Sequence, residues 1–520
     1  MTQAGEAEAK PGSRGILGRF LTVVEVAGNR LPDPVVLYLG LAAMVPLLSL
    51  VLLPFDWTKA HPVTGETVGL VNLLNREGIQ RMFTGAVDNF TSFPPLGVVL
   101  VTMMGIGLAE RTGLFSALIR LMVGKSPRAL ISLVVVFAGV MSSMAADAGY
   151  VVLTPLGAVV FAAVGRHPLA GLAAAFAGTA GGFSANFFLT GLDPLLSGFT
   201  LSGAQLLDPG AEVRPDANYY FMVVSVFLVT AAGWWVTDRI VEPRLGRWDP
   251  SQGSLEDVGE VIQPGETALK AEERRALWWA LGGLLGVIGI FLGLTLPQGA
   301  ILRDDEGTLA PFFHSLDVSI MLFFIVPGLA YGWAVGTCRS SKQFSKMTGD
   351  SMATMGSYIV LAFAAAQFVA YFRWSNLGLL TALSGADFLK ALGVGDLPLI
   401  LSFVLLAAVI NLVLGSASAK WGIMAPVFVP MFMALGLSPE MTQAAYRVGD
   451  SITNMVTPLN PYFPIILSFA ARYDRKLGIG TLISSMIPYS IAFGIGWTLL
   501  LVGWYLLGLP LGPGAPIHLP

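Results

Sequence analysis

The sequence predicts an all-α polytopic membrane protein with about nine transmembrane helices, two opposed re-entrant helical hairpins and an inverted internal repeat. Three observations support this fold class: charged residues are scarce, long apolar stretches recur, and two similar motifs lie far apart in the 520 residues. Only 12% of the residues are charged and the mean hydropathy is +0.71. Soluble domains carry roughly 25% charged residues, so the composition indicates a chain that is mostly surrounded by lipid.

Nine apolar stretches are candidates for crossing a hydrocarbon core about 30 Å thick. They are Pro34–Leu53, Pro95–Leu108 with its flanks, Ala129–Met144, Tyr219–Val236, Trp278–Leu296, Leu316–Val335, Tyr358–Phe372, Leu397–Leu414 and Thr481–Leu507. So many stretches exclude a signal peptide or a single anchor. The one cysteine excludes an internal disulfide, and the four histidines share no helical face. The sequence therefore argues against haem or a histidine-bound metal.

The basic residues predict the orientation, because Lys and Arg concentrate in cytoplasmic loops. Most of the 30 lie in five segments, at residues 10–30, 111–128, 239–275, 339–346 and 472–476. This places the N-terminus in the cytoplasm and the C-terminus in the periplasm. The expected organisation is a cytoplasmic tail (1–30), a first half (31–240), a polar cytoplasmic linker (241–275), a second half (276–508) and a periplasmic tail (509–520).

An internal repeat connects the two halves. Ser184–Pro194 aligns without gaps to Ser451–Pro461, sharing the pattern Ser, five residues, Thr, any residue, Leu, Asp or Asn, Pro. Upstream, Pro155, Gly165 and Pro168 match Pro426, Gly436 and Pro439. With the predicted orientation the two copies cross the membrane in opposite directions. Inverted segments interrupted by Gly or Pro point to a substrate site at the midplane, so the repeat favours alternating access.

Two short apolar segments, each followed by a polar turn, predict the hairpins near residues 168–194 and 439–461. Broken backbone at membrane depth persists only where protein or a water-filled cavity satisfies its polar groups. The helix ends beside such turns present N–H groups suited to anions and carbonyl groups suited to cations.

Ionisable residues within apolar segments are candidates for function, because each is costly to insert. Asp193 follows the first predicted tip and could cap a helix or act in coupling. Asp147 lies in a small-residue break, where it could cap a helix, mark a close packing of small residues or have a functional role. Arg447 and Asp450 lie three apart on one helical face. They could form a structural ion pair, or Arg447 could bind an anionic solute while Asp450 serves a proton or cation.

Oxygen-bearing side chains near the second predicted hairpin suggest a possible Na⁺ site. Asp450, Asn454, Asn411 and the carbonyl groups near Gly415 supply the required type of ligand. The coupling ion is thus H⁺ or Na⁺, and no other cofactor is expected.

Two further candidates precede that hairpin. Trp421, beside Lys420, offers an aromatic face for a solute or anchors the chain at the membrane interface. Ser418 has a hydroxyl that contacts the solute or merely packs.

The motifs resemble the p-aminobenzoyl-glutamate transporter (AbgT) family over essentially the whole chain. The motifs that carry this resemblance are Ser142–Pro155, Gly165–Gly171, Gly181–Asn186, Leu192–Pro194, Ser416–Trp421, Tyr446–Asp450 and Asn454–Pro461. One departure is Met144, where the family leads us to expect Asn.

The resemblance implies a homodimer of nine-span subunits with two opposed hairpins in a bacterial inner membrane. The family is associated with uptake of p-aminobenzoyl-glutamate and with export of sulfonamide antimetabolites. Its functional positions fall by motif on Asp193, Asn411, Ser418, Trp421, Pro439, Arg447, Asp450 and Pro458, and we add Asn186 and Asn454 from the same motifs. The expected partners are a small aromatic, anionic or sulfonamide solute and membrane lipid, without nucleic acid.

The sequence therefore predicts an ion-coupled secondary transporter rather than an enzyme. The absence of a Walker A pattern argues against direct ATP coupling. Two alternatives stay open at this point. One is an intramembrane aspartyl hydrolase in which Asp147 or Asp193 shares a proton with Asp450, and the other is a passive channel.

Overall fold

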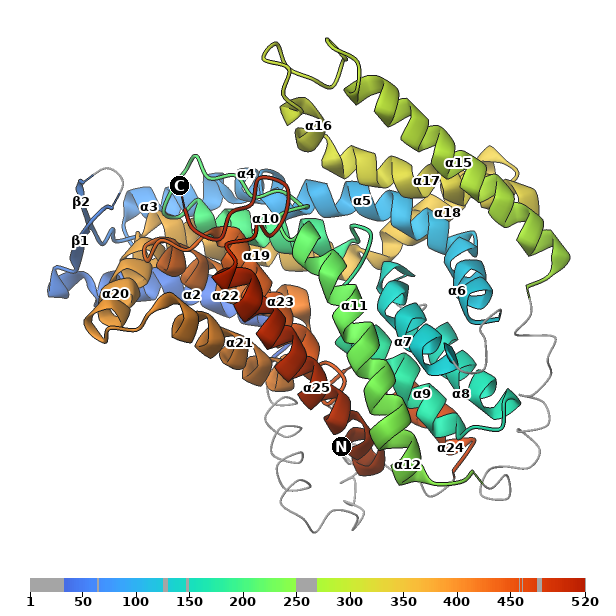
Figure 1. The fold of residues 1–520 in the computed structure, drawn as a ribbon. Helices are drawn as coiled ribbons and strands as arrows, with labels where there is room; N and C mark the ends of the chain where they lie inside the picture. Colours follow the sequence, from blue (N-terminus) through green and yellow to red (C-terminus); the bar gives the residue numbers. More distant parts are fainter. Residues whose placement is uncertain are drawn as a thin grey trace, which may run out of the picture.

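The computed structural model describes residues 32–62, 65–124, 130–145, 149–248, 269–457, 459–460, 462–474 and 479–519. In these ranges the chain is a bundle of helices with one short antiparallel hairpin, β1 (Thr58–Ala60) and β2 (Thr67–Gly69), in which Thr58 lies opposite Gly69 (Figure 1). The all-α prediction is confirmed.

The helices of the first half precede residue 246. They are α2 (Pro34–Val51), α3 (Arg76–Thr84), α4 (Ala86–Thr91), α5 (Pro94–Arg111), α6 (Leu114–Gly124), α7 (Ile131–Met141), α8 (Thr154–Ala163), α9 (Pro168–Phe176), α10 (Leu192–Ala204), α11 (Tyr219–Val236) and α12 (Glu242–Leu245). Proline is the first residue of α2, α5 and α9, where its missing N–H leaves no helical hydrogen bond unmade.

The helices of the second half begin at residue 271. They are α15 (Ala271–Thr295), α16 (Ala310–His314), α17 (Leu316–Val335), α18 (Ser341–Thr354), α19 (Gly356–Trp374), α20 (Leu377–Ala391), α21 (Asp396–Val413), α22 (Ala417–Met433), α23 (Pro439–Thr453), α24 (Phe463–Ala471) and α25 (Ile479–Leu506). The predicted linker and N-terminal tail lie mostly outside the described residues, so these domain boundaries stay predictions.

Seven helices in the described ranges are long and apolar enough to cross a membrane: α2, α11 continued to Leu245, α15, α17, α19, α21 and α25. Helices α5 and α6, bent by 62° at their junction, together form a possible eighth span. These elements contain eight of the nine predicted stretches. The ninth, Ala129–Met144, corresponds to the shorter apolar helix Ile131–Met144, so the number of about nine spans stays a prediction.

The predicted repeat is visible as two equivalent series of elements. Helices α7, α8 and α9, a non-helical break and α10 correspond to α21, α22 and α23, a second break and α24. Each third helix begins with a proline that follows a tight turn at a glycine of positive φ, +78° at Gly165 and +95° at Gly436. Only glycine adopts this backbone conformation without strain, which explains why the two copies share it.

The breaks fall where the hairpin tips are predicted, at residues 182–191 and around 454–462. Helix α9 packs along α8, whereas α10 packs on α5 and α22, and α23 packs along α21. Figure 1 shows α10 near the top of the view and α9 well below it. The helices on either side of a break therefore have different neighbours, and the re-entrant interpretation of segments 168–194 and 439–461 stays a prediction.

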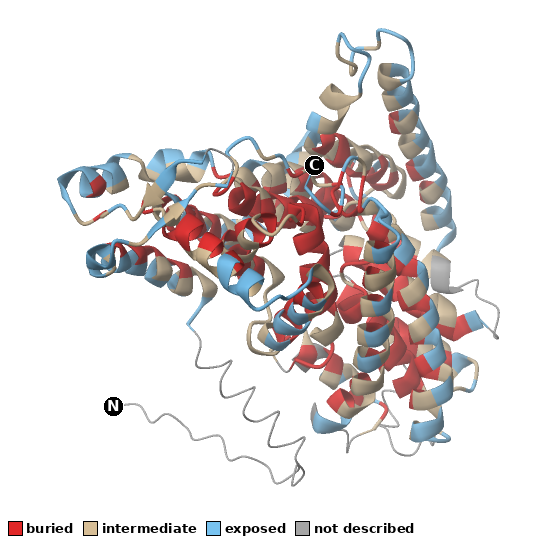
Figure 2. Ribbon diagram, turned by 60° about the vertical axis from the view of Figure 1, so that its left-hand side comes forward, coloured by how far each residue is buried: buried red, intermediate tan, exposed pale blue. Residues whose placement is uncertain are grey.

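Buried residues gather in the centre of the bundle, whereas the outer faces of its helices are exposed (Figure 2). Many exposed side chains are large and apolar, as expected for a lipid-facing surface. The C-terminal segment packs back onto the bundle, because the Ser438 N–H donates to the Ile517 carbonyl group at 2.9 Å and the Leu519 N–H to the Gly436 carbonyl group at 2.9 Å. The C-terminal segment thus fixes the residues that immediately precede the N-terminus of α23.

Candidate functional site

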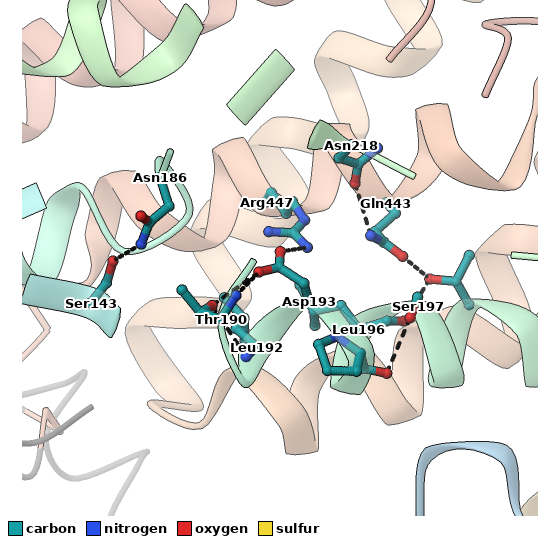
Figure 3. Close-up of polar contacts among 12 residues, drawn as sticks. Ser143, Asn186, Thr190, Leu192, Asp193, Leu196, Ser197, Asn218, Gln443 and Arg447 are labelled. Atoms are coloured by element: carbon teal, nitrogen blue, oxygen red, sulfur yellow. Dashed lines mark hydrogen bonds and ion pairs between the residues drawn. The ribbon is translucent and has the colours of Figure 1, made fainter. Parts of the chain in front are cut away.

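The two halves of the chain meet at a buried ion pair between Asp193 and Arg447 (Figure 3). Asp193 lies in the first turn of α10, directly after the first break, and is fully buried. Its Oδ2 accepts hydrogen bonds from the N–H and hydroxyl groups of Thr190, at 2.6 and 3.0 Å, and its Oδ1 accepts one from Arg447 Nη2 at 2.6 Å. Asp193 therefore holds Thr190 of the break and also binds the second half, whereas the N-cap position of α10 is occupied by Gly191.

Arg447 is in the middle of α23 and only 1% exposed. Its partner is Asp193, so the predicted pairing of Arg447 with Asp450 is wrong. Their spacing along α23 made Asp450 a possible partner of Arg447. In the fold, however, α10 brings Asp193 to Arg447 and α22 brings Lys420 to Asp450. The Arg447 Nε atom is buried and has no hydrogen-bond partner among the described residues.

Asp450 pairs with Lys420 of α22, and both side chains are almost completely buried. Tyr446 adds a hydroxyl group 3.2 Å from Asp450 Oδ1 and 2.7 Å from the Ala417 carbonyl oxygen. Burying two charges is unfavourable unless they are paired and hydrogen-bonded, and here both conditions are met. The second ion pair thus joins α22 to α23 close to the second break.

The oxygens that the sequence assigned to Na⁺ face hydrogen-bond donors. Asn411 Oδ1 and Asp450 Oδ1 both accept from the Lys420 ammonium. The Asn411 amide donates to the Asp450 carbonyl oxygen at 2.6 Å and to Asn454 Oδ1 at 2.8 Å. Gly415 lies by the second break, where an added Cβ would be 2.9 Å from a carbonyl oxygen. In this arrangement the Lys420 ammonium neutralises the Asp450 carboxylate and contacts two of the oxygens considered for Na⁺.

Trp421 is completely buried, so its interpretation as an interface anchor is wrong. Its ring stacks on Tyr446 with centroids 4.4 Å apart, and its Nε1–H donates to the Thr200 hydroxyl group at 2.9 Å. The indole is in the core because α22 packs between α10, α20 and α23. Ser418 lies one turn earlier, with its hydroxyl oxygen 3.2 Å from that of Ser416.

The other predicted residues lie around this core. Asn186, in the first break, donates to the Ser143 hydroxyl group at 2.7 Å and so joins the break to the end of α7 (Figure 3). Pro439 is the first residue of α23, where it starts the helix. Pro458 and Asp147 lie outside the described residues.

A buried polar chain extends the site beyond the predicted residues. The Thr200 hydroxyl group donates to Gln443 Oε1 at 2.6 Å, and Gln443 Nε2 donates to Asn218 Oδ1 at 2.8 Å (Figure 3). Gln443 could have been found from the sequence, because Gln443, Arg447 and Asp450 follow a helical spacing of four and three residues. Lys420 carried a comparable signal, as a charge within an apolar stretch.

Residues 19–519 match the model of the AbgT putative transporter family. The chain belongs to this family. The AbgT chain is 38% identical over 501 residues to the p-aminobenzoyl-glutamate transport protein of Escherichia coli K12, covering 96% of each sequence.

Two solved structures resemble the AbgT chain closely. The YdaH transporter of Alcanivorax borkumensis has a TM-score of 0.87 and 44% identity, covering 93% of this chain and 100% of that one. MtrF of Neisseria gonorrhoeae, described as illuminating a class of antimetabolite efflux pumps, has a TM-score of 0.90 and 43% identity, covering 96% and 100%.

The AbgT chain is therefore a membrane transporter and not an enzyme. The geometry agrees, because Asp193 and Asp450 are each paired with a cation rather than with another carboxyl group. A hydrolytic pair of aspartates needs two carboxyl groups that share one proton.

Proposed function

We propose that this AbgT chain is an ion-coupled secondary transporter of small aromatic anions, including p-aminobenzoyl-glutamate-like solutes and sulfonamide antimetabolites, working by alternating access. The observation that carries the proposal is the buried Asp193–Arg447 ion pair, which joins the two repeats at a helix break. The relatives named above supply p-aminobenzoyl-glutamate and antimetabolites as solute classes, and the family resemblance supplies the sulfonamides.

Arg447 is the residue proposed to bind the anionic group. Its guanidinium has five N–H donors in a rigid fork that suits carboxylates, and the Nε–H is buried and unused among the described residues. A solute carboxylate or deprotonated sulfonamide can take this donor and compete with Asp193 for the others. Solute binding then weakens the contact between the repeats, which is the coupling that alternating access requires.

The stacked rings of Trp421 and Tyr446 support an aromatic solute. Tyr446 directly precedes Arg447 on α23, so the stacked rings and the proposed anion-binding group belong to the same turn of this helix. Aromatic rings favour stacked or edge-to-face contacts, which suits a benzoyl or sulfanilyl ring when the helices separate.

The coupling ion that fits better is the proton. The Lys420 ammonium lies at the oxygens of Asn411 and Asp450, so a bound Na⁺ would be repelled by a neighbouring positive charge. A buried charge that loses its partner is strongly disfavoured and becomes neutral instead. Separation of Lys420 from Asp450 during transport would therefore take up or release a proton.

The cytoplasmic N-terminus, the periplasmic C-terminus and the homodimer belong to the same proposal. The distribution of basic residues supports the orientation, and the family resemblance supports the homodimer.

The test is uptake of radiolabelled p-aminobenzoyl-glutamate into proteoliposomes, with a Na⁺ gradient, a pH gradient, or neither. Wild type is compared with Asp193→Ala, Lys420→Met and Asp450→Ala. The matched control is Asp387→Ala. It breaks the ion pair between Asp387 and Lys59, which is as short as the Asp193–Arg447 pair but lies at the surface, where the Asp387 side chain is 58% exposed.

We expect a pH gradient to drive accumulation in wild type and the control, and the three buried-site variants to lose it. Accumulation driven only by Na⁺ contradicts proton coupling. Equilibration without any gradient dependence supports a passive channel. If no gradient drives accumulation of p-aminobenzoyl-glutamate but one drives accumulation of a sulfonamide, the solute class is restricted to sulfonamides.

A further inference from the structure

A large apolar groove lies apart from the ion pairs, between helices α15 and α17 on one side and α6 and α7 on the other. Its volume is about 820 Å³, and its walls include Leu281 and Leu284 of α15, Ile320 and Phe324 of α17, and Phe188 of the first break. Figure 1 shows α15 and α17 side by side at the upper right, with α6 and α7 below them. Ligand sites commonly measure about 300–1,000 Å³, so the groove has room for a bound molecule.

The groove opens toward the lipid. Trp278 lines it and is 71% exposed, so the groove reaches the outside of the helix bundle. Helices α15 and α17 are both long and apolar enough to span the membrane, and the outside of the bundle at their depth is therefore hydrocarbon. A cavity with walls of this kind does not hold ordered water, because water needs polar partners.

One end of the groove carries a positive charge. Arg274, in the first turn of α15, lines the groove and is exposed. Its neighbour Glu273 already pairs with Arg120 at 2.6 Å, and Arg274 forms no ion pair among the described residues. Arg and Trp one turn apart are typical of the level of lipid head groups.

The dimensions suit an acyl chain attached to a head group. From Arg274 to Ile288 the helix rises about 21 Å, at 1.5 Å a residue. One leaflet of a hydrocarbon core about 30 Å thick is roughly 15 Å deep, so an acyl chain whose head group is at Arg274 fits within the lined length of α15.

We propose that this groove binds one phospholipid, with an acyl chain against α15 and α17 and its phosphate at Arg274. Guanidinium and phosphate groups match in charge and geometry. The inference does not depend on which solute is transported.

The lipid would also contact the first break, which carries residues that position Asp193. Phe187, Phe188 and Leu189 of the first break line the groove. The residues on either side of them, Asn186 and Thr190, form hydrogen bonds to Ser143 and Asp193. An acyl chain packed against the three apolar side chains therefore limits the movement of the segment that positions Asp193.

The test is native mass spectrometry of the full chain purified in mild detergent, after incubation with phosphatidylglycerol, phosphatidylcholine or free glycerol phosphate. Leu284→Trp fills the groove, and Leu285→Trp is its matched control, since Leu285 is 57% exposed and does not line the groove. Arg274→Gln removes the charge, with Arg275→Gln, on the exposed surface outside the groove, as its control.

We expect one phosphatidylglycerol to remain bound to wild type and to both controls. Leu284→Trp should lose it, and Arg274→Gln should weaken its binding by about tenfold, the equivalent of one charge-assisted hydrogen bond. Equal lipid binding by Leu284→Trp and Leu285→Trp would overturn the proposal, as would equal binding of free glycerol phosphate. Conversion of a dimer into a monomer by Leu284→Trp alone would instead assign the groove to a second copy of the chain.

Discussion

Replacing Asp193 by alanine should destabilise the chain more than most single substitutions do. The change leaves the guanidinium of Arg447, 1% exposed, without its anion, and it removes an acceptor that receives two hydrogen bonds from Thr190. Breaking a buried pair from one side costs about 3–5 kcal/mol, because an uncompensated charge stays in the core. Arg447→Ala should cost a similar amount for the same reason.

The double variant distinguishes a true ion pair from two independent contacts. If the pair is coupled, Asp193→Ala with Arg447→Ala should cost about as much as either single change, far less than the sum of roughly 6–10 kcal/mol. The free energy of unfolding is measured by titration with sodium dodecyl sulfate in mixed micelles. A double-mutant cycle on Lys59 and Asp387 is the control, since this pair has the same 2.6 Å distance but is partly exposed. It should give a coupling of about 0–1 kcal/mol. Additive costs at Asp193 and Arg447 would refute the reasoning.

Three further predictions concern the surroundings of the site. Gly422→Ala should cost about 1–3 kcal/mol by overpacking, because the new Cβ would meet the Tyr38 hydroxyl group and lie 2.8 Å from the Phe199 ring. Gly496→Ala, with no atom closer than 3.6 Å, should be neutral or slightly stabilising in the same titration. Deletion of residues 510–520 removes the buried side chains of Leu511, Ala515 and Ile517 and the Pro516 carbonyl group that accepts from Ser438, and should lower the free energy of unfolding by at most roughly 3–6 kcal/mol. Lys420→Met should abolish accumulation driven by a pH gradient in proteoliposomes and should also lower the free energy of unfolding, because Asp450 is left buried without its cation. Na⁺-driven uptake gained by this variant would show that the lysine excludes Na⁺.

Properties that depend on local composition were predictable from the sequence. The apolar stretches predicted the seven long apolar helices and the bent pair α5–α6, because the length needed to cross hydrocarbon is set by the helical rise alone. The repeat was predictable because Gly165 and Gly436 are needed at positive φ and the following prolines begin helices. The motifs also identified the family to which the chain belongs.

Which residues contact each other was decided by the tertiary structure. Spacing on α23 suggested a pair between Arg447 and Asp450, whereas the fold pairs Arg447 with a carboxylate 254 positions away and Asp450 with Lys420. Such partners come from helices that are far apart in the sequence, and helical periodicity describes only one helix at a time.

The burial of Trp421 and the groove beside α15 were decided in the same way. A tryptophan near a helix end suits the membrane interface as well as the core, and only the packing of α22 against its neighbours makes it a buried residue. The sequence by itself determined that this is an α-helical membrane protein with a repeated, interrupted design, because those properties follow from hydrophobicity and backbone conformation. The tertiary structure determined which charges are paired and which surfaces remain open to lipid, because both depend on distances between helices that no local pattern encodes.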